Sequence, residues 1–402
     1  MTSIKLADRV TNIRVSPSTA AAQKVRDLKA QGRQIYNLTV GEPDFDTPDP
    51  IKEAAIAAIH AGETKYTPVN GTVALREAIQ QDYKTRLNID CDLNEICVGG
   101  GGKQVLFVAL MATVQEGDEV IIPAPYWVSY PDMVIANGGT PVIVKCDETV
   151  GFKLTPEALE AAITPATKWV VLNSPSNPTG AAYTAAELRA LGDVLVKHPH
   201  VLVMCDEMYD RIWYADFDAC SILGVCPELK PQALVSNGVS KSYAMTGWRI
   251  GYAVGPLELV NAINKLQSQM SSCPSSVSQA AAAFALTADQ SGVTETVEVY
   301  RARRDRAHEL INAIPELSCT LPDGAFYLYP SCAGAIGKTT PEGKKIESDL
   351  DFGLYLLDSV GVASVHGGAY GLEPYFRIST ATSMEEIEAA CGKIAEACAA
   401  LV

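Results

Sequence analysis

The chain has 402 residues, 48% of them hydrophobic and 20% charged, which is enough for two or three ordinary domains with sizeable cores. Its formal net charge of −15 makes nucleic acid and anionic membrane surfaces unfavourable partners. A small anion could still bind where a few arginines and lysines gather.

The eleven cysteines are scattered without a Cys-X-X-Cys pair, and the five histidines do not cluster with them. We therefore expect reduced thiols, no metal site and a cytoplasmic location. Residues 1–17 are polar and lack the apolar core of a secretory signal. No apolar run approaches the roughly 20 residues that cross a bilayer, so we expect no membrane-spanning helix.

Residues 1–50 are expected to be rich in loops, because prolines interrupt them at positions 17, 43, 48 and 50. Short apolar runs and helical segments then alternate. The apolar runs are residues 119–123, 140–146, 169–172, 201–205 and 233–236, and the helical segments are 104–114, 156–163 and 184–197. Because these runs are continuously apolar, they predict strands of a largely parallel sheet that helices cover on both faces.

The end of the chain has a different pattern. Residues 279–314 are expected to form a long helical stretch, followed by an apolar segment at 325–329, and Met384 is expected to begin a final helix. We predict an α/β fold in which residues 51–278 form a large domain around the mostly parallel sheet. Residues 1–50 and 279–402 are expected to form a smaller α+β domain with an N-terminal arm.

Lys241 follows a predicted strand and a glycine-containing turn, between Ser240 and Ser242, and Arg249 comes eight residues later. A lysine taken alone is usually a solvated surface residue. Small hydroxyl side chains and a cation at a strand end can, however, hold a phosphate near an amine. A lysine that forms a Schiff base with a phosphate-bearing aldehyde cofactor needs such surroundings.

Three further polar side chains follow apolar strands, and α/β sheets place their ligands at the carboxyl ends of strands. Asp206 could pair with a protonated ring nitrogen, although it could also cap a helix. Asn177 lies in an Asn-Pro-Thr-Gly turn and could donate a hydrogen bond to a phenolic oxygen of the cofactor. Tyr209 could share that oxygen.

Residues 99–103 read Gly-Gly-Gly-Gly-Lys before a predicted helix, and the backbone N–H groups of such a helix start bind phosphate. A flexible connector is the alternative interpretation. The run is not a Walker A loop, because Cys97 and Gln104 occupy positions that this motif requires to be Gly and Ser or Thr. Trp127 could stack on a flat ring, and Arg377 could clamp a carboxylate, whereas a core aromatic residue and a surface arginine are the plain alternatives.

Together and in this order, these motifs resemble the class I and II aminotransferases of fold type I. The similarity is greatest to the bacterial aspartate aminotransferase subgroup related to prephenate aminotransferases. It runs from the Ser-Pro-Ser at residues 16–18 to the C-terminal helix, and its most specific segments are residues 40–48, 123–131, 173–180 and 240–249.

The resemblance implies pyridoxal 5′-phosphate as cofactor. Lys241 would be the Schiff-base lysine and proton carrier, and Asp206 would be the partner of the pyridine nitrogen. The other residues implied at the cofactor are Asn177 and Tyr209 at the phenolic oxygen, Trp127 at the ring, and Gly102, Lys103, Ser240 and Arg249 at the phosphate. Tyr66 would reach the phosphate of a neighbouring subunit, which implies a homodimer with shared active sites.

The resemblance also implies the substrate site. Gly41 and Arg377 would receive the α-carboxylate, Lys103 would meet the distal carboxylate of a dicarboxylate, and Trp127 and Asn177 would also line the site. Ala20 departs from the subgroup, which usually has threonine there, and this concerns the side-chain pocket rather than the cofactor site. Thr380 is a second departure, because tyrosine is more usual.

The implied reaction is ping-pong transamination, with aspartate expected as the amino donor and 2-oxoglutarate as the 2-oxo acid acceptor. Three alternatives remain open. The enzyme could be an aromatic or prephenate aminotransferase, or it could be a lyase or decarboxylase on the same fold. A non-enzymatic regulator that binds the cofactor is the third, although no basic helix-turn-helix segment accompanies it.

Overall fold

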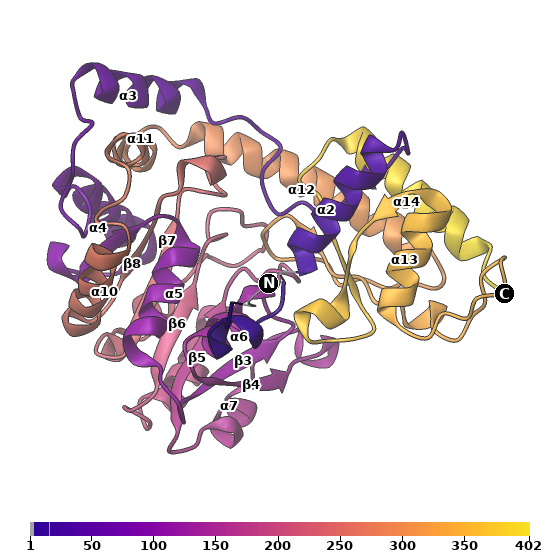
Figure 1. Ribbon diagram of the computed structural model, residues 1–402, viewed down its shortest axis with the longest axis horizontal. Coiled ribbons are helices and arrows are strands. Elements are labelled where there is room, and N and C mark those ends of the chain that lie inside the picture. The colour runs from indigo at the N-terminus through magenta and orange to yellow at the C-terminus, as the bar shows by residue number, and fades with distance from the viewer. Residues whose placement is uncertain (1–3, 16) are drawn as a thin grey trace.

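A seven-stranded sheet occupies the centre of the larger part of the molecule in the computed structural model, which describes residues 4–15 and 17–402 (Figure 1). The strand order is β2-β8-β7-β6-β5-β3-β4, and β8 runs antiparallel to both neighbours while the remaining pairs are parallel. The strands are β2 Ile96–Gly99, β3 Glu119–Ala124, β4 Thr140–Lys145, β5 Thr167–Asn173, β6 Leu202–Asp206, β7 Ala233–Gly238 and β8 Gly251–Val254. The prediction of a mostly parallel α/β sheet is confirmed.

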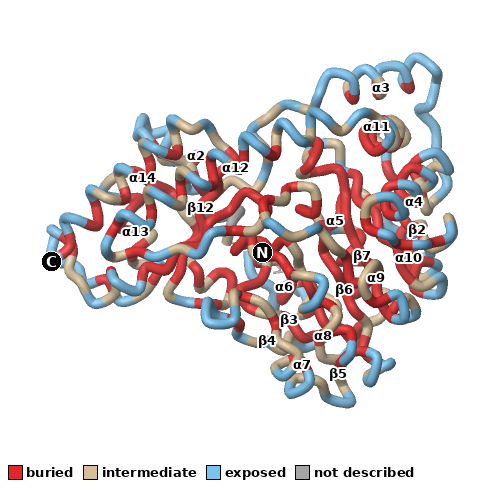
Figure 2. Tube along the Cα trace, turned by 180° about the vertical axis from the view of Figure 1, so that it is seen from behind, coloured by how far each residue is buried: buried red, intermediate tan, exposed pale blue. Residues whose placement is uncertain are grey.

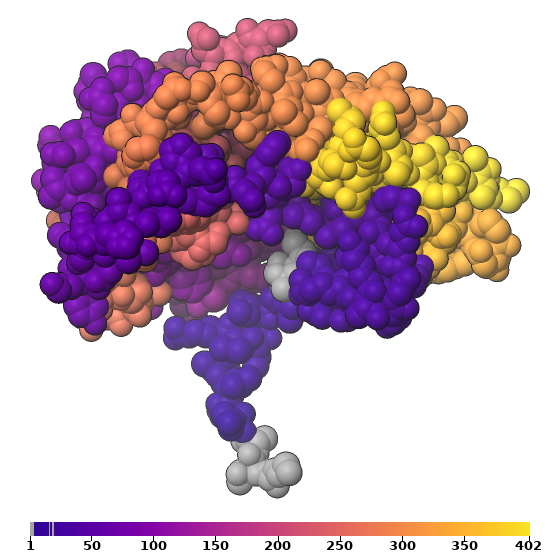
Figure 3. Space-filling model, turned by 90° about the horizontal axis from the view of Figure 1, so that it is seen from above, coloured from indigo at the N-terminus to yellow at the C-terminus, as the bar shows by residue number. Residues whose placement is uncertain are grey.

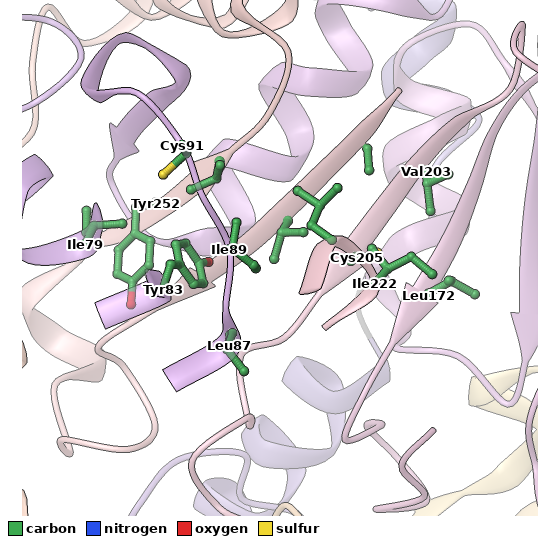
Figure 4. Packing of buried hydrophobic residues seen from close by; sticks show 14 of the residues in the cluster. Ile79, Tyr83, Leu87, Ile89, Cys91, Leu172, Val203, Cys205, Ile222 and Tyr252 are labelled. Carbon is green, nitrogen blue, oxygen red and sulfur yellow. The ribbon is translucent and has the colours of Figure 1, made fainter. Parts of the chain in front are cut away.

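Alternate residues of the central strands face opposite sides of the sheet and enter two separate apolar clusters. In β6, Val203 and Cys205 enter one cluster, and Met204 enters the other. Figure 4 shows the first cluster, where Leu172 of β5 lies beside Cys205 and Ile222. Because both faces are covered, β7 is buried along its length and β6 is buried from Val203 onward (Figure 2). This double burial explains why their sequences are continuously apolar.

The helices associated with this sheet pack on both of its faces. α5 and α10 supply apolar residues to the cluster on one face, and α4, α8 and α11 supply them to the cluster on the other. Thr184 caps α8 in a capping box with Glu187. The helices are α3 Asp49–His60, α4 Val73–Leu87, α5 Gly102–Thr113, α6 Ser129–Ala136, α7 Pro156–Ala162, α8 Ala185–Leu195, α9 Ile222–Val225, α10 Leu257–Met270 and α11 Ser276–Thr287.

The remaining elements gather at the other side of the molecule, where the C-terminus lies (Figure 1). Leu38 near the N-terminus shares an apolar core with Ile311, Phe376 and Ile394, so both ends of the chain build this part together. Its strands are β1 Tyr36–Asn37 with β10 Val362–Ala363, and the antiparallel set β11 Val365–His366, β12 Phe376–Ser379 and β9 Tyr327–Leu328. Its helices are α2 Pro17–Ala30, α12 Ser291–Asn312, α13 Asp349–Val360 and α14 Met384–Ala399.

The loop-rich N-terminal region also contains the helix α2, which begins at Pro17, since proline is well tolerated in the first turn of a helix. The expectation of one long helical stretch near the C-terminus was wrong. Residues 279–314 form two helices rather than one. The break follows Thr287, and α11 packs on α3 and α4 whereas α12 packs on α14 and β9. We propose that the domain boundary lies in this break; the division into two domains otherwise stays a prediction.

The N-terminal segment extends away from the body, as the indigo projection in Figure 3 shows. It contains the short helix α1 Asp8–Thr11 and exposes Ile4, Leu6 and Val15. Among residues 4–15 and 17–402, no helix is both long and apolar enough to cross a membrane. The short 3-10 helices are η1 Leu93–Glu95, η2 Glu148–Val150, η3 Pro227–Leu229, η4 Thr246–Trp248, η5 Ala333–Ala335 and η6 Gly367–Tyr370.

Candidate active site

The carboxyl ends of four neighbouring strands bring the predicted site residues together. Asn173 at the end of β5 is in register with Asp206 at the end of β6, and Asp206 is in register with Ser236 of β7. Lys241 follows the end of β7 by three residues, and Trp127 follows the end of β3 by three. This edge of a parallel sheet is where α/β proteins bind their ligands.

The Lys241 amine lies inside this group of side chains. It donates a hydrogen bond to the backbone carbonyl of Gly41, and it lies 6.0 Å from the centre of the Tyr209 ring. Burial lowers the pKa of Lys241 to about 8, and the positive charges of Arg377 and Arg249 act in the same direction. A lysine with such a pKa can exchange a proton near neutral pH, which an ordinary surface lysine rarely does.

Asp206 is buried, and two hydrogen bonds fix its carboxylate. The Tyr130 hydroxyl donates to one oxygen at 2.7 Å, and the Met208 backbone N–H donates to the other at 3.3 Å. Burial raises the pKa of Asp206 above its ordinary value, although these hydrogen bonds and the charge of Lys241 oppose the shift. A cation placed against this carboxylate would remove the cost of burying it unpaired.

Arg377 of β12 is almost completely buried without an acidic partner among the described residues. Its guanidinium donates to the Asn177 side-chain oxygen at 3.0 Å and to the Thr39 carbonyl at 2.7 Å, and it lies 4.4 Å above the Tyr327 ring. Its Nε–H has no hydrogen-bond partner. A buried arginine with a free donor fits a carboxylate ligand, which supplies both the charge and the missing acceptor.

The glycine loop before α5 packs closely against the Arg249 side chain. Gly101 has a φ of +99°, and a Cβ there would lie 2.2 Å from the Arg249 guanidinium. Arg249 donates to the carbonyls of Gly100 and Thr246, so it stands beside the start of α5 at Gly102. Ser240 is buried, and the nearby Ser236 hydroxyl has no hydrogen-bond partner. A helix start, a cation and hydroxyl groups fit a phosphate.

Lys103 lies at the mouth of the site, with its amine 4.7 Å from the centre of the Trp127 ring. Partial burial and the charge of Arg249 lower the pKa of Lys103. A pocket of about 430 Å³ opens beside Lys103 and Arg249 and is also lined by Arg14 and Asp132, which pair with each other. Lys103 and Arg249 leave a positive charge beside this pocket, which suits anionic substrates.

Not every predicted residue reaches the site within one chain. Tyr66 is 90% exposed, on the connection between α3 and α4, so a single chain does not bring it to Lys241. Ala20 is exposed on α2. Ser16, where the resemblance begins, lies outside the described residues, so the Ser-Pro-Ser segment is only partly described.

Two tyrosines of the site were missed by sequence reasoning. Tyr130 supports Asp206, and the Tyr327 hydroxyl lies 2.8 Å from the Tyr209 hydroxyl while its ring lies beneath Arg377. Tyr130 is three residues after Trp127, within a segment already singled out, so its place near a strand end was a usable signal. Tyr327 gave no such signal, because its partner Tyr209 is 118 residues away in sequence.

Comparison with known proteins identifies the family. The model for aminotransferase class I and II matches residues 33–394. A relative from Rhizobium leguminosarum bv. phaseoli, named probable aspartate/prephenate aminotransferase, is 52% identical over 98% of this chain and 99% of its own length. The chain belongs to the class I and II aminotransferase family.

Two solved structures share the fold of this aminotransferase. The aspartate aminotransferase of Rhizobium meliloti is 50% identical, covers 100% of both chains and has a TM-score of 0.98. The aspartate aminotransferase of Thermus thermophilus with maleate is 37% identical, covers 98% of this chain and 100% of its own, and has a TM-score of 0.91. Fold type I is thereby confirmed, and the reaction of this aminotransferase is transamination.

Proposed function

We propose that this aminotransferase binds pyridoxal 5′-phosphate at Lys241 and transfers the amino group of aspartate to 2-oxoglutarate. The observation that carries the proposal is the convergence of Lys241, Asp206 and Arg377, from three distant segments, on one edge of the sheet. The buried Arg377 without an acidic partner supports a carboxylate substrate, and the glycine loop beside Arg249 supports a phosphate-bearing cofactor.

When bound, the cofactor's protonated pyridine ring accepts the electron pair that the substrate α-carbon keeps when it loses its proton. Asp206, held by Tyr130, would pair with the ring nitrogen and keep it protonated. The residues that would hold the rest of the cofactor are Asn177 and Tyr209 at the phenolic oxygen, Trp127 at the ring, and Gly102, Lys103, Ser240 and Arg249 at the phosphate.

Lys241 would move the proton from the substrate α-carbon to the aldehyde carbon of the cofactor. Its amine suits this exchange, because a pKa of about 8 lets it accept and release a proton near neutral pH. Arg377 would hold the α-carboxylate with two parallel hydrogen bonds, assisted by the backbone of Gly41. These contacts would fix the α-carbon near the Lys241 amine, which contributes to the rate through orientation.

The aspartate preference rests on Lys103, whose charge at the mouth of the site would meet a distal carboxylate. The R. leguminosarum relative is named for aspartate and prephenate, and the T. thermophilus structure is described with maleate, a dicarboxylate. Prephenate or an aromatic substrate is the second candidate, because Ala20 is smaller than the threonine usual in the subgroup. The exposed Tyr66 supports a homodimer in which each subunit completes the site of the other.

The ratio of kcat/KM for aspartate to kcat/KM for phenylalanine tests the substrate preference. Lys103→Gln should lower this ratio, because an unpaired carboxylate in a partly closed site costs roughly 2–5 kcal/mol. Lys265→Gln, on the exposed face of α10, removes the same charge away from the site and should leave the ratio unchanged. A ratio that Lys103→Gln also leaves unchanged would remove the basis for the aspartate preference.

A further inference from the structure

Gln290 occupies the break between α11 and α12, where the chain passes from the sheet-bearing part to the long helix beside α14. It is the N-cap residue of α12, and its carbonyl accepts hydrogen bonds from Val293 and Thr294. α12 then runs towards the C-terminal side of the molecule (Figure 1). The side chain of Gln290 therefore stands at the joint between the two packed parts.

The Gln290 amide makes four hydrogen bonds. Its Nε2 donates to the carbonyl of Ala285 at 3.0 Å and to that of Ala288 at 2.7 Å. Its Oε1 accepts from the Tyr243 hydroxyl at 2.7 Å and from the Arg211 guanidinium at 3.2 Å. A glutamine amide has two N–H donors and two acceptor positions, so every hydrogen-bonding position of this amide has a partner.

Both donors to Gln290 Oε1 belong to segments that carry proposed active-site residues. Tyr243 is buried two residues after Lys241, and the Met245 N–H closes this turn by donating to the Ser240 carbonyl at 3.1 Å. This hydrogen bond ties the backbone on either side of Lys241 and Tyr243 into one turn, so the two residues share a closed backbone segment.

Arg211 is the second donor, and it lies two residues after Tyr209. Its guanidinium lies 5.5 Å from the Tyr243 ring and pairs with Asp82 of α4. Asp82 also pairs with Arg86, which in turn pairs with Asp210. The Gln290 amide thus ends a mostly buried ionic network that holds the segment after β6 against α4.

We propose that Gln290 is a positioning residue of the active site, which holds the Lys241 turn in alignment with the 206–211 segment through the Tyr243 hydroxyl and the Arg211 guanidinium. Because Gln290 also joins α11 to α12, this alignment depends on how the two helices meet. The inference rests on the proposed function, since it requires Lys241 to move the α-proton. Gln290 itself touches neither substrate nor cofactor.

The test is the single-turnover reaction of the holoenzyme with aspartate and with α-deuterated aspartate. Gln290→Met keeps the length of the side chain and removes the amide. A misaligned amine should lower the limiting rate constant roughly tenfold to hundredfold, while the half-saturating aspartate concentration stays within about twofold. The primary deuterium isotope effect should increase, because proton transfer then limits the reaction more fully.

Tyr243→Phe provides the second variant, because it removes one hydroxyl from a buried ring and leaves the packing intact. It should lower the same rate constant and raise the same isotope effect. The double variant should be no slower than the slower single variant, since both changes break one connection. If Gln290→Met fails to fold, the isotope effect of Tyr243→Phe still decides the matter.

Gln232→Met is the matched control. Gln232 is a buried glutamine whose amide also donates to two carbonyls, those of Leu195 and Val201, but it precedes β7 at the opposite end of the strand from Lys241. It should lose stability without change in the limiting rate constant or the isotope effect. A merely structural role for Gln290 predicts the same behaviour for Gln290→Met.

The inference is overturned if Gln290→Met or Tyr243→Phe leaves both the rate constant and the isotope effect at wild-type values, or if the two effects are additive. Failure of the proposed function has a separate signature. Borohydride reduction followed by peptide mapping would then place the wild-type cofactor on a residue other than Lys241. An adduct on Lys241 together with unaffected variants refutes only the role of Gln290.

Discussion

Lys241 and Arg377 are two cations in one site, and their surroundings act on them differently. The lysine loses basicity on burial, so its amine can be neutral near physiological pH. An arginine stays charged, and Arg377 is held by two neutral acceptors, Asn177 and Thr39, that leave its charge for a ligand. The same edge of the sheet thus offers one group for proton transfer and one for binding.

The pKa of Lys241 has a measurable consequence in the cofactor-free protein. Only the neutral amine attacks an aldehyde, so the rate of cofactor incorporation should rise with pH and reach half its maximum near pH 8. The cofactor-free fold should also gain stability between about pH 8 and the ordinary lysine value of 10.5, because the unfolded chain holds this proton more tightly there. Stopped-flow absorbance measures the incorporation rate, and a midpoint near 10.5 would contradict the shifted pKa.

At the scale of elements, the position of the glycine loop depends on β8. Gly251 is the first residue of this strand. The direction in which a side chain would leave its Cα faces the backbone of Gly101 and Gly102. A Cβ there would lie 2.1 Å from the Gly102 nitrogen and 2.4 Å from the Gly101 carbonyl carbon. Backbone at the start of a packed helix cannot move aside as a flexible side chain does.

Gly251→Ala should therefore displace the loop, destabilise the protein by about 1–3 kcal/mol and weaken cofactor binding. Gly392→Ala in α14 is the matched control, because its Cβ would meet nothing within 4 Å and helical alanine is favoured by about 0.5–1 kcal/mol. Thermal unfolding and cofactor dissociation of both variants provide the measurement. Equal stability and equal cofactor affinity in the two variants would refute the close packing of β8 on the loop.

The sequence predicted the elements whose pattern is local. The runs that became β3, β4, β5, β6 and β7 were found because they are continuously apolar. Burial on both faces explains this pattern in β3, β5, β6 and β7, whereas β4 lies at the edge of the sheet and is only partly buried. β2 and β8 were missed, because each has only four residues and pairs antiparallel with the other. The break between α11 and α12 was also missed: the residues 288–290 that form it contain neither proline nor glycine, and tertiary packing determines it.

At the scale of the whole molecule, contacts between segments distant in sequence determine how the side chains of the site are arranged. The motifs predicted which residues gather, but the Tyr130–Asp206 hydrogen bond spans 76 residues and the Arg377–Asn177 bond spans 200. No local pattern contains such pairs. The role of Tyr66 also could not be found within one chain, because its proposed partner is the phosphate of a second subunit.

Subunit mixing tests this shared site. In a homodimer with shared sites, Lys241→Ala lowers the activity of the subunit's own site. Tyr66→Phe lowers the activity of the neighbouring subunit's site. After unfolding and reassembly together, hybrid dimers should contain one site with both residues intact, so activity should exceed that of either parent. Mass spectrometry of the hybrids verifies exchange, and unchanged activity despite verified exchange would argue against shared sites.

Peptide mapping after borohydride reduction tests the central claim most directly, because the whole account depends on where the cofactor is attached. Borohydride makes the bond between the cofactor and the lysine permanent, and mass spectrometry then locates the modified residue. We predict a single adduct on the peptide that contains Lys241, and its absence in Lys241→Ala, which should also have lost turnover. An adduct on any other lysine of the wild-type protein would contradict the assignment of the active site to this edge of the sheet.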